Sequence, residues 1–230
     1  MKITERLQIL DGTTLKIIAM VCMVFDHVGD NFFPEAVWMR VIGRIAMPVF
    51  AFCVAEGYGH THDRMKYLRR LLLFGVISEI PFDLVTAGKA VAFGHQNIMF
   101  TFSWAILGLM CLDRALAKAD RKWKKALFTA LAALAFLIGS VLLRLDYTVL
   151  GVLLIFTYHL LRDKAVWFRN TAAAAVCALV NNVGIYVFAL LGFIPVYFYN
   201  GKRGKGLKWL FYAFYPGHLL LIWALRELLR

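Results

Sequence analysis

The feature that most constrains this sequence is the recurrence of apolar runs about twenty residues long, from Leu15 into the C-terminal region. A helix of about 20 apolar residues spans the hydrocarbon core of a bilayer, and a single soluble core could not bury so many of them. Hydrophobic residues make up 61% of the chain and charged residues only 17%, a balance typical of membrane proteins. The sequence therefore predicts an all-α, polytopic transmembrane helix bundle.

The apolar runs predict about nine spans, within a range of about eight to ten. The expected spans are 14–32, 36–58, 67–86, 97–112, 124–143, 146–161, 171–182, 184–199 and 207–227. The region 171–199 stays open, because Asn181-Asn182 and Gly184 fit either a turn between two short helices or an unwound point inside one span.

The distribution of Lys and Arg predicts the orientation. Most of the 26 cationic side chains fall in segments on the side of the N-terminus, whereas the other side holds only Lys89, Arg144, Arg226 and Arg230. Because cytoplasmic loops carry an excess of Lys and Arg, we expect a cytoplasmic N-terminus in a bacterial cytoplasmic (inner) membrane. This excess of Lys and Arg in cytoplasmic loops explains the net charge of +12. We therefore expect the lipid bilayer as a partner and expect no nucleic acid.

The chain is expected to form one integral-membrane domain over residues 1–230, because it shows no linker, low-complexity tract or internal repeat. The first apolar run contains Asp26 and His27 and lacks a small-residue cleavage site, so it is expected to be a retained span. The cysteines Cys22, Cys53, Cys111 and Cys177 show no metal-ligand or redox spacing. We expect them to be core residues and expect no metal.

Polar side chains from several segments fall at one depth, near the outer face of the predicted bundle. Ionisable groups inside hydrocarbon are costly, so several at one depth indicate a site. They are Asp26, His27, Arg40, Arg44, Glu79, Asp83, Gln96, Asn97, Asp146, Tyr147, Asn181, Asn182, Tyr215 and His218. We expect one water-accessible cavity there, open to the outer side, with His27 at its floor.

Spacing refines this expectation. Arg40 and Arg44 are four residues apart and share a helix face, whereas the adjacent Asp26 and His27 point about 100° apart. We therefore expect Asp26 to pair with an Arg of the second span rather than with His27. A buried ion pair and a substrate clamp both remain compatible with Arg40 and Arg44.

A basic and aromatic lip is predicted at the inner face, between the second and third spans. It consists of Glu56, His60, Lys66, Tyr67, Arg69 and Arg70. Such a lip fits the phosphates of a nucleotide-like cofactor, and equally the headgroups of anionic lipids. His60 and His62 are two residues apart and supply too few ligands for zinc.

Several stretches together resemble the TraX family over nearly the whole chain. These are Leu15 to Met20, Asp26 to Gly29, Arg40 to Phe52, Glu56-Gly57 with His60-Thr61, Lys66 to Leu71, Ser78 to Asp83, Gln96-Asn97 and Tyr215 to Leu219. The family is named for a conjugation protein that acetylates the N-terminus of pilin, and it is distantly similar to larger integral-membrane acyltransferases. In those enzymes an intramembrane His serves the chemistry and acyl-CoA comes from the cytosol, so the resemblance implies His27 as the catalytic residue and acetyl-CoA or another acyl-CoA as co-substrate.

The residues are consistent with that implied chemistry. Acyl transfer from a thioester requires a base for the acceptor's proton, and imidazole titrates near neutral pH. The developing oxyanion requires donors, which Arg44, Asn97 or Tyr215 could supply. We expect an acyl-CoA-dependent membrane acyltransferase that modifies an amine or hydroxyl of an extracytoplasmic acceptor: a pilin, a glycan or another envelope component. The expected catalytic residues are His27, Asp26, Arg44 and Glu79; the expected substrate-binding residues are Arg40, Asp83, Gln96, Asn97, Asp146, Tyr147, Tyr215 and His218; the lip is expected to bind the cofactor.

Two other classes of function explain the same intramembrane charges. A transporter or ion pathway needs them as well, although the chain lacks the repeats typical of transporters. An assembly component of a surface apparatus could use the charged pairs only to hold its helices together.

Overall fold

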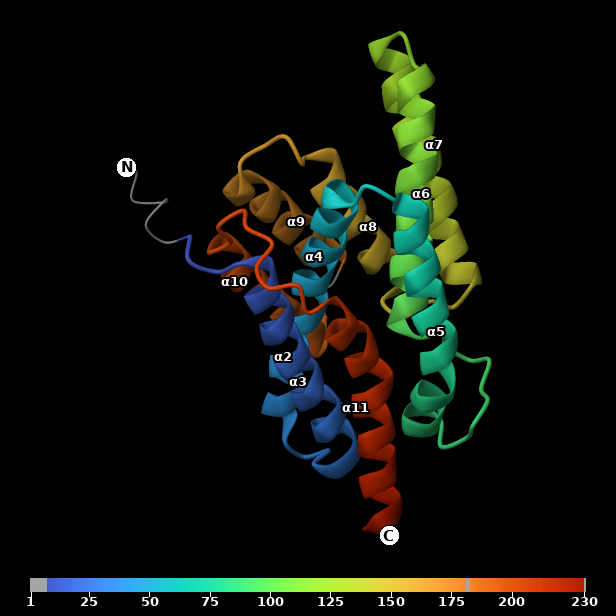
Figure 1. Cartoon of the computed structure of the whole chain (residues 1–230), viewed down its shortest axis with the longest axis vertical. Coiled ribbons are helices and arrows are strands. Elements are labelled where there is room, and N and C mark those ends of the chain that lie inside the picture. The colour runs from blue at the N-terminus through green and yellow to red at the C-terminus, as the bar shows by residue number, and fades with distance from the viewer. Residues whose placement is uncertain (1–7, 181–182, 230) are drawn as a thin grey trace.

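The computed structural model describes residues 8–180 and 183–229, and the elements found there are helices (Figure 1). They are α2 (Gly12–Phe32), α3 (Val37–Gly43), α4 (Ala46–His60), α5 (Arg64–Thr86), α6 (Ile98–Lys118), α7 (Lys122–Leu142), α8 (Thr148–Leu160), α9 (Val166–Val180), the 3₁₀ helix η1 (Gly184–Gly192), α10 (Phe193–Tyr197) and α11 (Lys208–Leu228). Extended pairing in these residues is limited to two isolated bridges, Leu10 with Tyr199 and Gln96 with Leu145. The predicted all-α class is confirmed.

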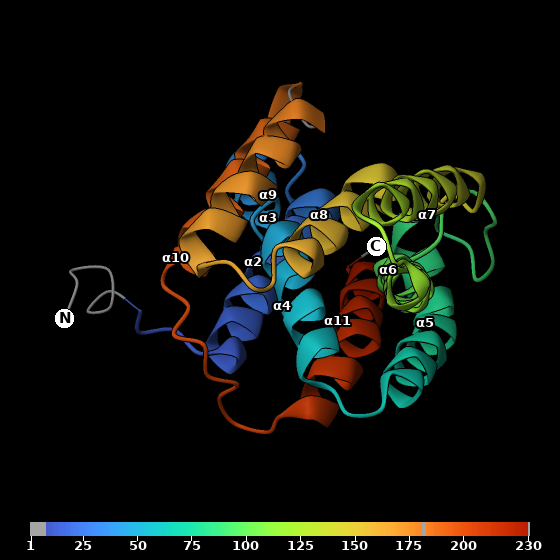
Figure 2. The same ribbon diagram turned by 90° about the horizontal axis from the view of Figure 1, so that it is seen from above.

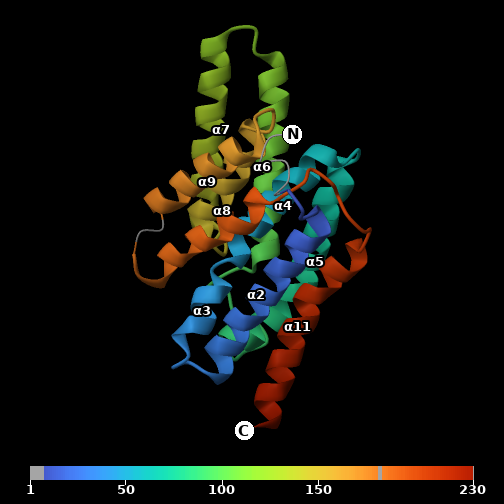
Figure 3. The same cartoon turned by 90° about the vertical axis from the view of Figure 1, so that its left-hand side faces the viewer.

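The long helices run up and down and define two ends of the bundle. We call the end at which α2, α5, α7, α9 and α11 begin the basic end, and the other the opposite end. Figures 1 and 3 show the α6–α7 turn at the top, on the basic end, and the C-terminus at the bottom. Short turns join antiparallel neighbours, as in other helix bundles.

The centre of the bundle is α4, which packs against α2, α6, α8 and η1 and lies in the middle of the molecule in Figure 2. Its Phe52 and Tyr58 are among the largest fully buried side chains, together with Tyr158 of α8. The ring of Phe52 lies edge-on to Tyr158, with 5.1 Å between ring centroids. Apolar rings around one central helix therefore form the core.

Within the described residues, four helical segments are long and apolar enough to cross a membrane: Gly12–Phe32, Val37–His60, Ile98–Lys118 and Lys122–Leu142. On α7, Ser140 is the one buried residue, and Leu131, Leu134 and Ile138 are exposed. Apolar side chains on the outside of a helix are stable in lipid, where water does not reach them. The chain is thus a membrane-embedded helix bundle, while the count of nine spans and the cytoplasmic N-terminus remain predictions.

The structure differs from the expected spans in two places. The span expected at 36–58 corresponds to the candidate span Val37–His60, but it is not one continuous helix, because α3 ends at Gly43 and α4 begins at Ala46. The span expected at 184–199 is the 3₁₀ helix η1 followed by the five-residue α10. Asn181 and Asn182, on which the choice between one and two spans rested, lie outside the described residues.

Two prolines lie inside helices that border the site. Pro81 is within α5 and Pro216 within α11. A proline has no N–H to donate and clashes with the carbonyl four residues earlier, so each helix is expected to deviate locally from regular geometry. Both prolines fall near the level of the polar side chains described next.

Candidate functional site

An ion-pair cluster joins the beginning of the α3–α4 segment to α2 near the opposite end. Asp26 accepts a hydrogen bond from Arg40 Nε at 2.9 Å and forms a salt bridge with Arg44 Nη2 at 2.5 Å. Arg40 also pairs with Asp30. The expected pairing of Asp26 with an Arg of the second span is therefore confirmed.

A glycine allows this cluster to form. A Cβ atom added at Gly43 would lie 2.2 Å from Cβ of Asp26, a distance that side chains do not tolerate. Gly43 thus lets α3 approach α2 closely enough for both arginines to reach one carboxylate. Arg44 is buried, with 6% of its surface exposed, so its charge depends on that carboxylate.

Two tyrosines flank the buried guanidinium. The rings of Tyr147 and Tyr186 lie 6.0 Å and 5.4 Å from Cζ of Arg44, distances at which a cation is attracted to an aromatic face. Tyr147 has a φ of 53°, a left-handed conformation that is rare for a bulky residue. The ring of Tyr147 is therefore held near Arg44 by a strained backbone conformation.

His27 lies beside His218, although the two are 191 residues apart in sequence. Their ring centroids are 5.3 Å apart. His218 is buried and stacks on Phe214, and its Nδ1 bonds the Phe214 carbonyl at 2.9 Å. Since Nδ1 must donate in that bond, Nε2 carries a lone pair, and it has no partner among the described residues.

The surroundings of His27 are polar. It is half-buried, and its ring makes no hydrogen bond that the structure describes. Asp26, Asp146 and Arg44 all lie close enough to interact with it electrostatically. The structure thus places a free imidazole among charged groups from separate segments.

A second polar group lies where α5 meets the start of α6. Asn97 caps α6 by accepting from Met99 N at 3.0 Å, and its amide donates to the Gly75 carbonyl at 2.9 Å and to Glu79. The other carboxylate oxygen of Glu79 is buried without a partner among the described residues. Asp83 accepts from Ala92 N at 2.6 Å, so it fixes the following loop.

That loop also carries an exposed pair. His95 Nε2 lies 3.3 Å from Asp146 Oδ1, and this hydrogen bond raises the pKa of His95 above its ordinary value. Gln96 is joined through its backbone to Arg144 and Asp146. The pair and the backbone bonds hold the α5–α6 and α7–α8 loops together.

A cavity of about 590 Å³ lies between α2, α4, α5, α6 and α11. Its deep part is apolar and aromatic, with Met20, Met23, Met99, Phe214 and Tyr215 among the lining residues. Met23 is one turn before His27, and Phe214 is one turn before His218. The deep end therefore comes within about one helical turn, or ~5.4 Å along the axis, of the histidine pair.

The mouth of this cavity is at the basic end and is cationic. It is lined there by Lys16, His60, His62, Arg70, Arg203, Lys205 and Lys208. Of the predicted cofactor residues, Glu56, His60, Tyr67 and Arg70 line the cavity. Lys66 and Arg69 are exposed and are not among the lining residues, and Lys66 pairs with Asp63 at 3.4 Å.

Of the predicted substrate-binding residues, Tyr215 reaches this cavity. His27, Asp26, Arg40 and Arg44 lie beyond its deep end and are not among the residues that line it. The expected cavity open to the outer side stays a prediction, whereas the cavity that the structure describes opens at the basic end.

Glu56 has a structural role in the cavity wall. It forms a salt bridge at 2.7 Å with Arg169 of α9, which is buried. The guanidinium of Arg169 also lies 5.6 Å from the ring of the core residue Phe52. A half-buried carboxylate held in this way is not available as a free anion at the mouth.

Sequence reasoning missed a network at the basic end. Asp113 of α6 accepts from Tyr58 at 2.9 Å and from Arg64 at 2.7 Å, and its other oxygen lies 2.8 Å from His159 Nε2. The network joins α4, α5, α6 and α8. The sequence signal that could have revealed this network is the carboxylate of Asp113 in an otherwise apolar helix.

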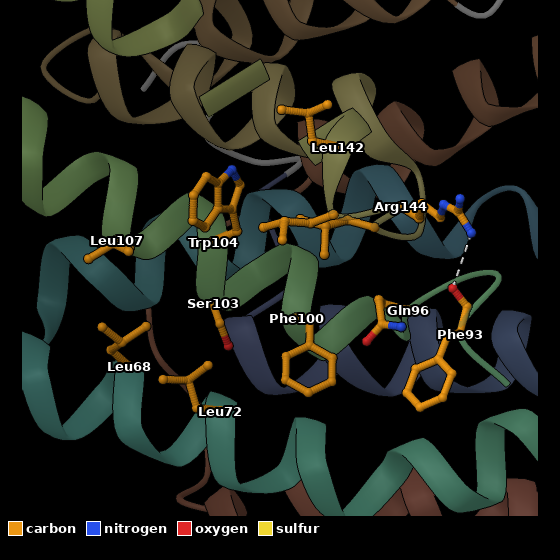
Figure 4. A pocket seen from close by; sticks show the side chains of 12 residues that line it. Leu68, Leu72, Phe93, Gln96, Phe100, Ser103, Trp104, Leu107, Leu142 and Arg144 are labelled. Carbon is orange, nitrogen blue, oxygen red and sulfur yellow. Dashed lines mark hydrogen bonds between the residues drawn. The ribbon is translucent and has the colours of Figure 1, made fainter. Parts of the chain in front are cut away.

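A second, shallower groove of about 590 Å³ lies where α5 and α6 meet the end of α7 (Figure 4). Its walls are mainly apolar, including Leu72, Phe100 and Trp104. Gln96 and Arg144 lie toward one end, where Arg144 bonds the Phe93 carbonyl at 3.4 Å. Gln96, predicted to bind substrate, thus lines this groove and not the larger cavity.

The arrangement suits chemistry between two compartments. A cationic mouth attracts an anionic group, an apolar shaft accepts a thin apolar arm, and a histidine pair lies at the far end beside fixed charges. Within the described residues no three His, Cys, Asp or Glu side chains lie close enough together to hold a metal ion.

Comparison with known proteins agrees with this architecture. Residues 11–226 match the family described as TraX protein. The chain is 29% identical to the probable fimbrial assembly protein FimC, serogroup H1, of Dichelobacter nodosus, over 94% of this chain and 96% of that protein. It is 28% identical to Protein TraX of Escherichia coli, over 72% of this chain and 62% of that protein.

No solved structure matches the chain. The family match nevertheless extends from the cap of α2 nearly to the end of α11, and so includes the cavity and both histidines. This membrane-embedded helix bundle belongs to the TraX family.

Proposed function

We propose that the protein is an integral-membrane acyltransferase that moves an acyl group, here acetyl, from cytosolic acyl-CoA to an extracytoplasmic acceptor. The observation that carries the proposal is the cavity that leads from a cationic mouth to within a helical turn of His27 and His218. The mouth would face the cytoplasm, because Lys and Arg are concentrated at that end. The opposite end, with His27 and Arg44, would then face the acceptor.

The cavity fits the shape of the donor. A long apolar shaft can hold the pantetheine arm, and the rings of Tyr215 and Phe214 close its deep end. A ligand held in this way brings its thioester near the histidines while its phosphates stay in the cationic mouth. The donor and acceptor are thus held in one place, which lowers the entropic part of the barrier.

The residues of the opposite end have distinct roles in the reaction. His27 accepts the proton of the acceptor amine or hydroxyl as it attacks the thioester carbonyl, and donates a proton to the departing thiolate. The carbon–sulfur bond breaks and a carbon–nitrogen or carbon–oxygen bond forms, so no other co-reactant is needed. Arg44 contributes positive charge near the developing oxyanion, and Asp26 holds Arg44 in place.

The acceptor is proposed to be a protein subunit or another component of a surface structure. The names of the relatives support this, because one is a probable fimbrial assembly protein and another is Protein TraX. A free amine or hydroxyl exposed on the outer side is the chemistry that His27 can activate.

The test is transfer of labelled acetyl from acetyl-CoA to isolated cell envelopes by the protein in nanodiscs. His27→Ala should lower the rate by at least about 10²-fold and leave the CoA dissociation constant unchanged, since removal of a general base has that effect on the chemical step. His95→Ala is the matched control, because His95 is exposed in a loop, and it should keep full activity. Unchanged turnover in His27→Ala would remove His27 from the mechanism.

A second candidate, an assembly component without catalytic activity, is favoured by the name of the fimbrial relative and by the Asp26 cluster. In that case His27→Ala and Asp26→Asn would lose assembly and stability together, and no labelled acetyl would be transferred by the unsubstituted protein.

A further inference from the structure

The segment 199–208, which runs from the end of α10 to the first residue of α11, passes over the start of α2, and we call it the strap. Figures 1 and 2 show it as the orange to red segment that runs past the beginning of α2 to α11. Asn200 N donates to the Leu10 carbonyl at 2.8 Å, and Gly12 N donates to the Lys202 carbonyl at 2.8 Å. The strap is therefore fixed through its backbone to the first described segment of the chain.

Side chains of α2 and two glycines complete this attachment. The Thr13 hydroxyl donates to the Lys205 carbonyl at 2.7 Å. Gly201 and Gly204 both have φ of 77°, which favours glycine, and a Cβ at Gly204 would lie 2.5 Å from Cγ of Asp11. The route of the strap is thus determined by its backbone, and its cationic side chains are not needed for its attachment.

Those cations surround the mouth of the large cavity and have weak partners there: Lys16 and Lys208 lie 5.0 Å from the centres of the Phe211 and Trp209 rings, and Asp11 interacts electrostatically with Lys205. Arg203, Lys205 and Lys208 line the mouth together with Lys16 and Arg70, and none of the five forms a salt bridge within residues 8–180 and 183–229. The single carboxylate among the lining residues is Glu56, which Arg169 already neutralises. Cations gathered at one opening raise the local concentration of anions and favour their entry.

The start of α11 adds to this positive potential. Leu207, which precedes the helix, provides no side-chain cap, and the first turn holds no acidic residue. The first turn instead begins with Lys208, although a cation is unfavourable at the positive end of a helix dipole. An anion bound there would satisfy both the lysine and the uncapped N–H groups.

We propose that the strap is the phosphate-recognition element of the cavity. Arg203, Lys205 and Lys208 bind the phosphate groups at the nucleotide end of the acyl donor, while Lys16 and Arg70 face them from α2 and α5. This assignment rests on the proposed function, and it moves the main phosphate contacts from Lys66 and Arg69 to a segment near the other end of the chain. Anionic lipid headgroups share the same phosphate chemistry, so the experiment must separate the two sources.

The test compares two donors of different length. Acetyl-CoA carries the nucleotide phosphates, and S-acetylpantetheine lacks them. The strap variant Arg203→Gln with Lys205→Gln is compared with a control variant, Lys122→Gln with Lys125→Gln, which removes the same charge from exposed side chains of α7 at the same end. Binding is measured by calorimetry in nanodiscs of neutral lipid, and the unfolding midpoint verifies that both variants fold.

The strap variant should bind CoA about 10- to 100-fold more weakly, since each charge-assisted contact contributes about tenfold. Its affinity for S-acetylpantetheine should not change, and the control variant should bind both donors as the unsubstituted protein does. The decrease of CoA affinity with added salt should also be shallower in the strap variant.

Two outcomes overturn the assignment in distinguishable ways. If the strap variant binds CoA as tightly as the unsubstituted protein, the strap is not the phosphate site, while the proposed function stands. If the unsubstituted protein binds no CoA but binds vesicles that contain phosphatidylglycerol, and the strap variant loses that binding, the cations serve lipid headgroups. In that case the proposed donor is wrong as well.

Discussion

The two ends of the bundle hold positive charge in different ways. Near the opposite end, Arg40 and Arg44 converge on one carboxylate, and Arg44 is buried between two aromatic rings. At the basic end, Arg203, Lys205 and Lys208 are exposed and form no salt bridge that the structure describes. The first arrangement is internally neutralised and rigid, whereas the second leaves charge for a molecule that is still to bind.

The comparison shows that residue type alone does not assign a role. The same guanidinium group has a fixed partner where a carboxylate lies beside it, as at Arg44, and stays available to a ligand where none does, as proposed for Arg203. It follows that removing charge should damage stability at the opposite end and affinity at the basic end.

The largest effect on stability is expected for Asp26→Asn. The substitution leaves Arg44 buried without its carboxylate, and an unpaired buried charge costs about 3–5 kcal/mol. Asp30→Asn is the control, because Asp30 is exposed and pairs with Arg40 alone, so its loss should cost less than ~1 kcal/mol. The measurement is reversible unfolding in detergent; equal losses in the two variants would show that the Asp26 cluster is no more important than a surface ion pair.

The next effect is expected for Gly43→Ala. The added methyl group would meet Asp26 and push α3 away from α2, which should cost about 2 kcal/mol as overpacking does elsewhere. Gly59→Ala, at a site in α4 with open space around it, should be neutral or slightly stabilising. A Gly43→Ala protein as stable as Gly59→Ala would contradict the close packing of α2 and α3.

A smaller effect, on rate and not on stability, is expected for His218→Asn. The amide can still donate to the Phe214 carbonyl, but the lone pair of Nε2 beside His27 is lost. We expect kcat for acetyl transfer to fall about tenfold, which corresponds to ~1.4 kcal/mol, with unchanged CoA affinity. Full kcat would show that His218 only packs against His27.

The smallest effect is a pH dependence at the exposed pair of His95 and Asp146. The folded protein raises the pKa of His95, so the pair stabilises the protein fully below about pH 6.5 and loses this contribution as pH rises through the raised pKa. The difference in unfolding free energy between the protein and His95→Gln should be below ~1 kcal/mol, because the histidine is exposed. A difference that stays constant from pH 6 to pH 9 would show that the charge of His95 does not matter.

Part of this architecture could be predicted from the sequence. Apolar runs located the long helices, because their length is fixed by the bilayer. The depth and four-residue spacing of Arg40 and Arg44 predicted that one of them would meet Asp26. Both inferences rely on lengths and spacings within a single helix, and these do not change when the helices pack together.

Other parts could not be predicted, since they depend on contacts between distant segments. Residues 43–46 lie inside a longer apolar run that was expected to be one span, so the end of α3 and the beginning of α4 could not be recognised there. Thr13 and Lys205 are hydrogen-bonded across 192 residues, and no periodicity reports such a contact. The strap cations therefore counted only toward orientation, although they lie at the mouth of the cavity.

The last helix is held at both ends, by the strap at its start and by Arg226 near its end, which bonds Asn31 and the carbonyls of Leu84 and Val85. Because α11 forms one wall of the cavity and carries His218, the shaft has no closed form until this helix has been synthesised and inserted. The proposed acyl-transfer site is therefore assembled only when α11 joins the bundle.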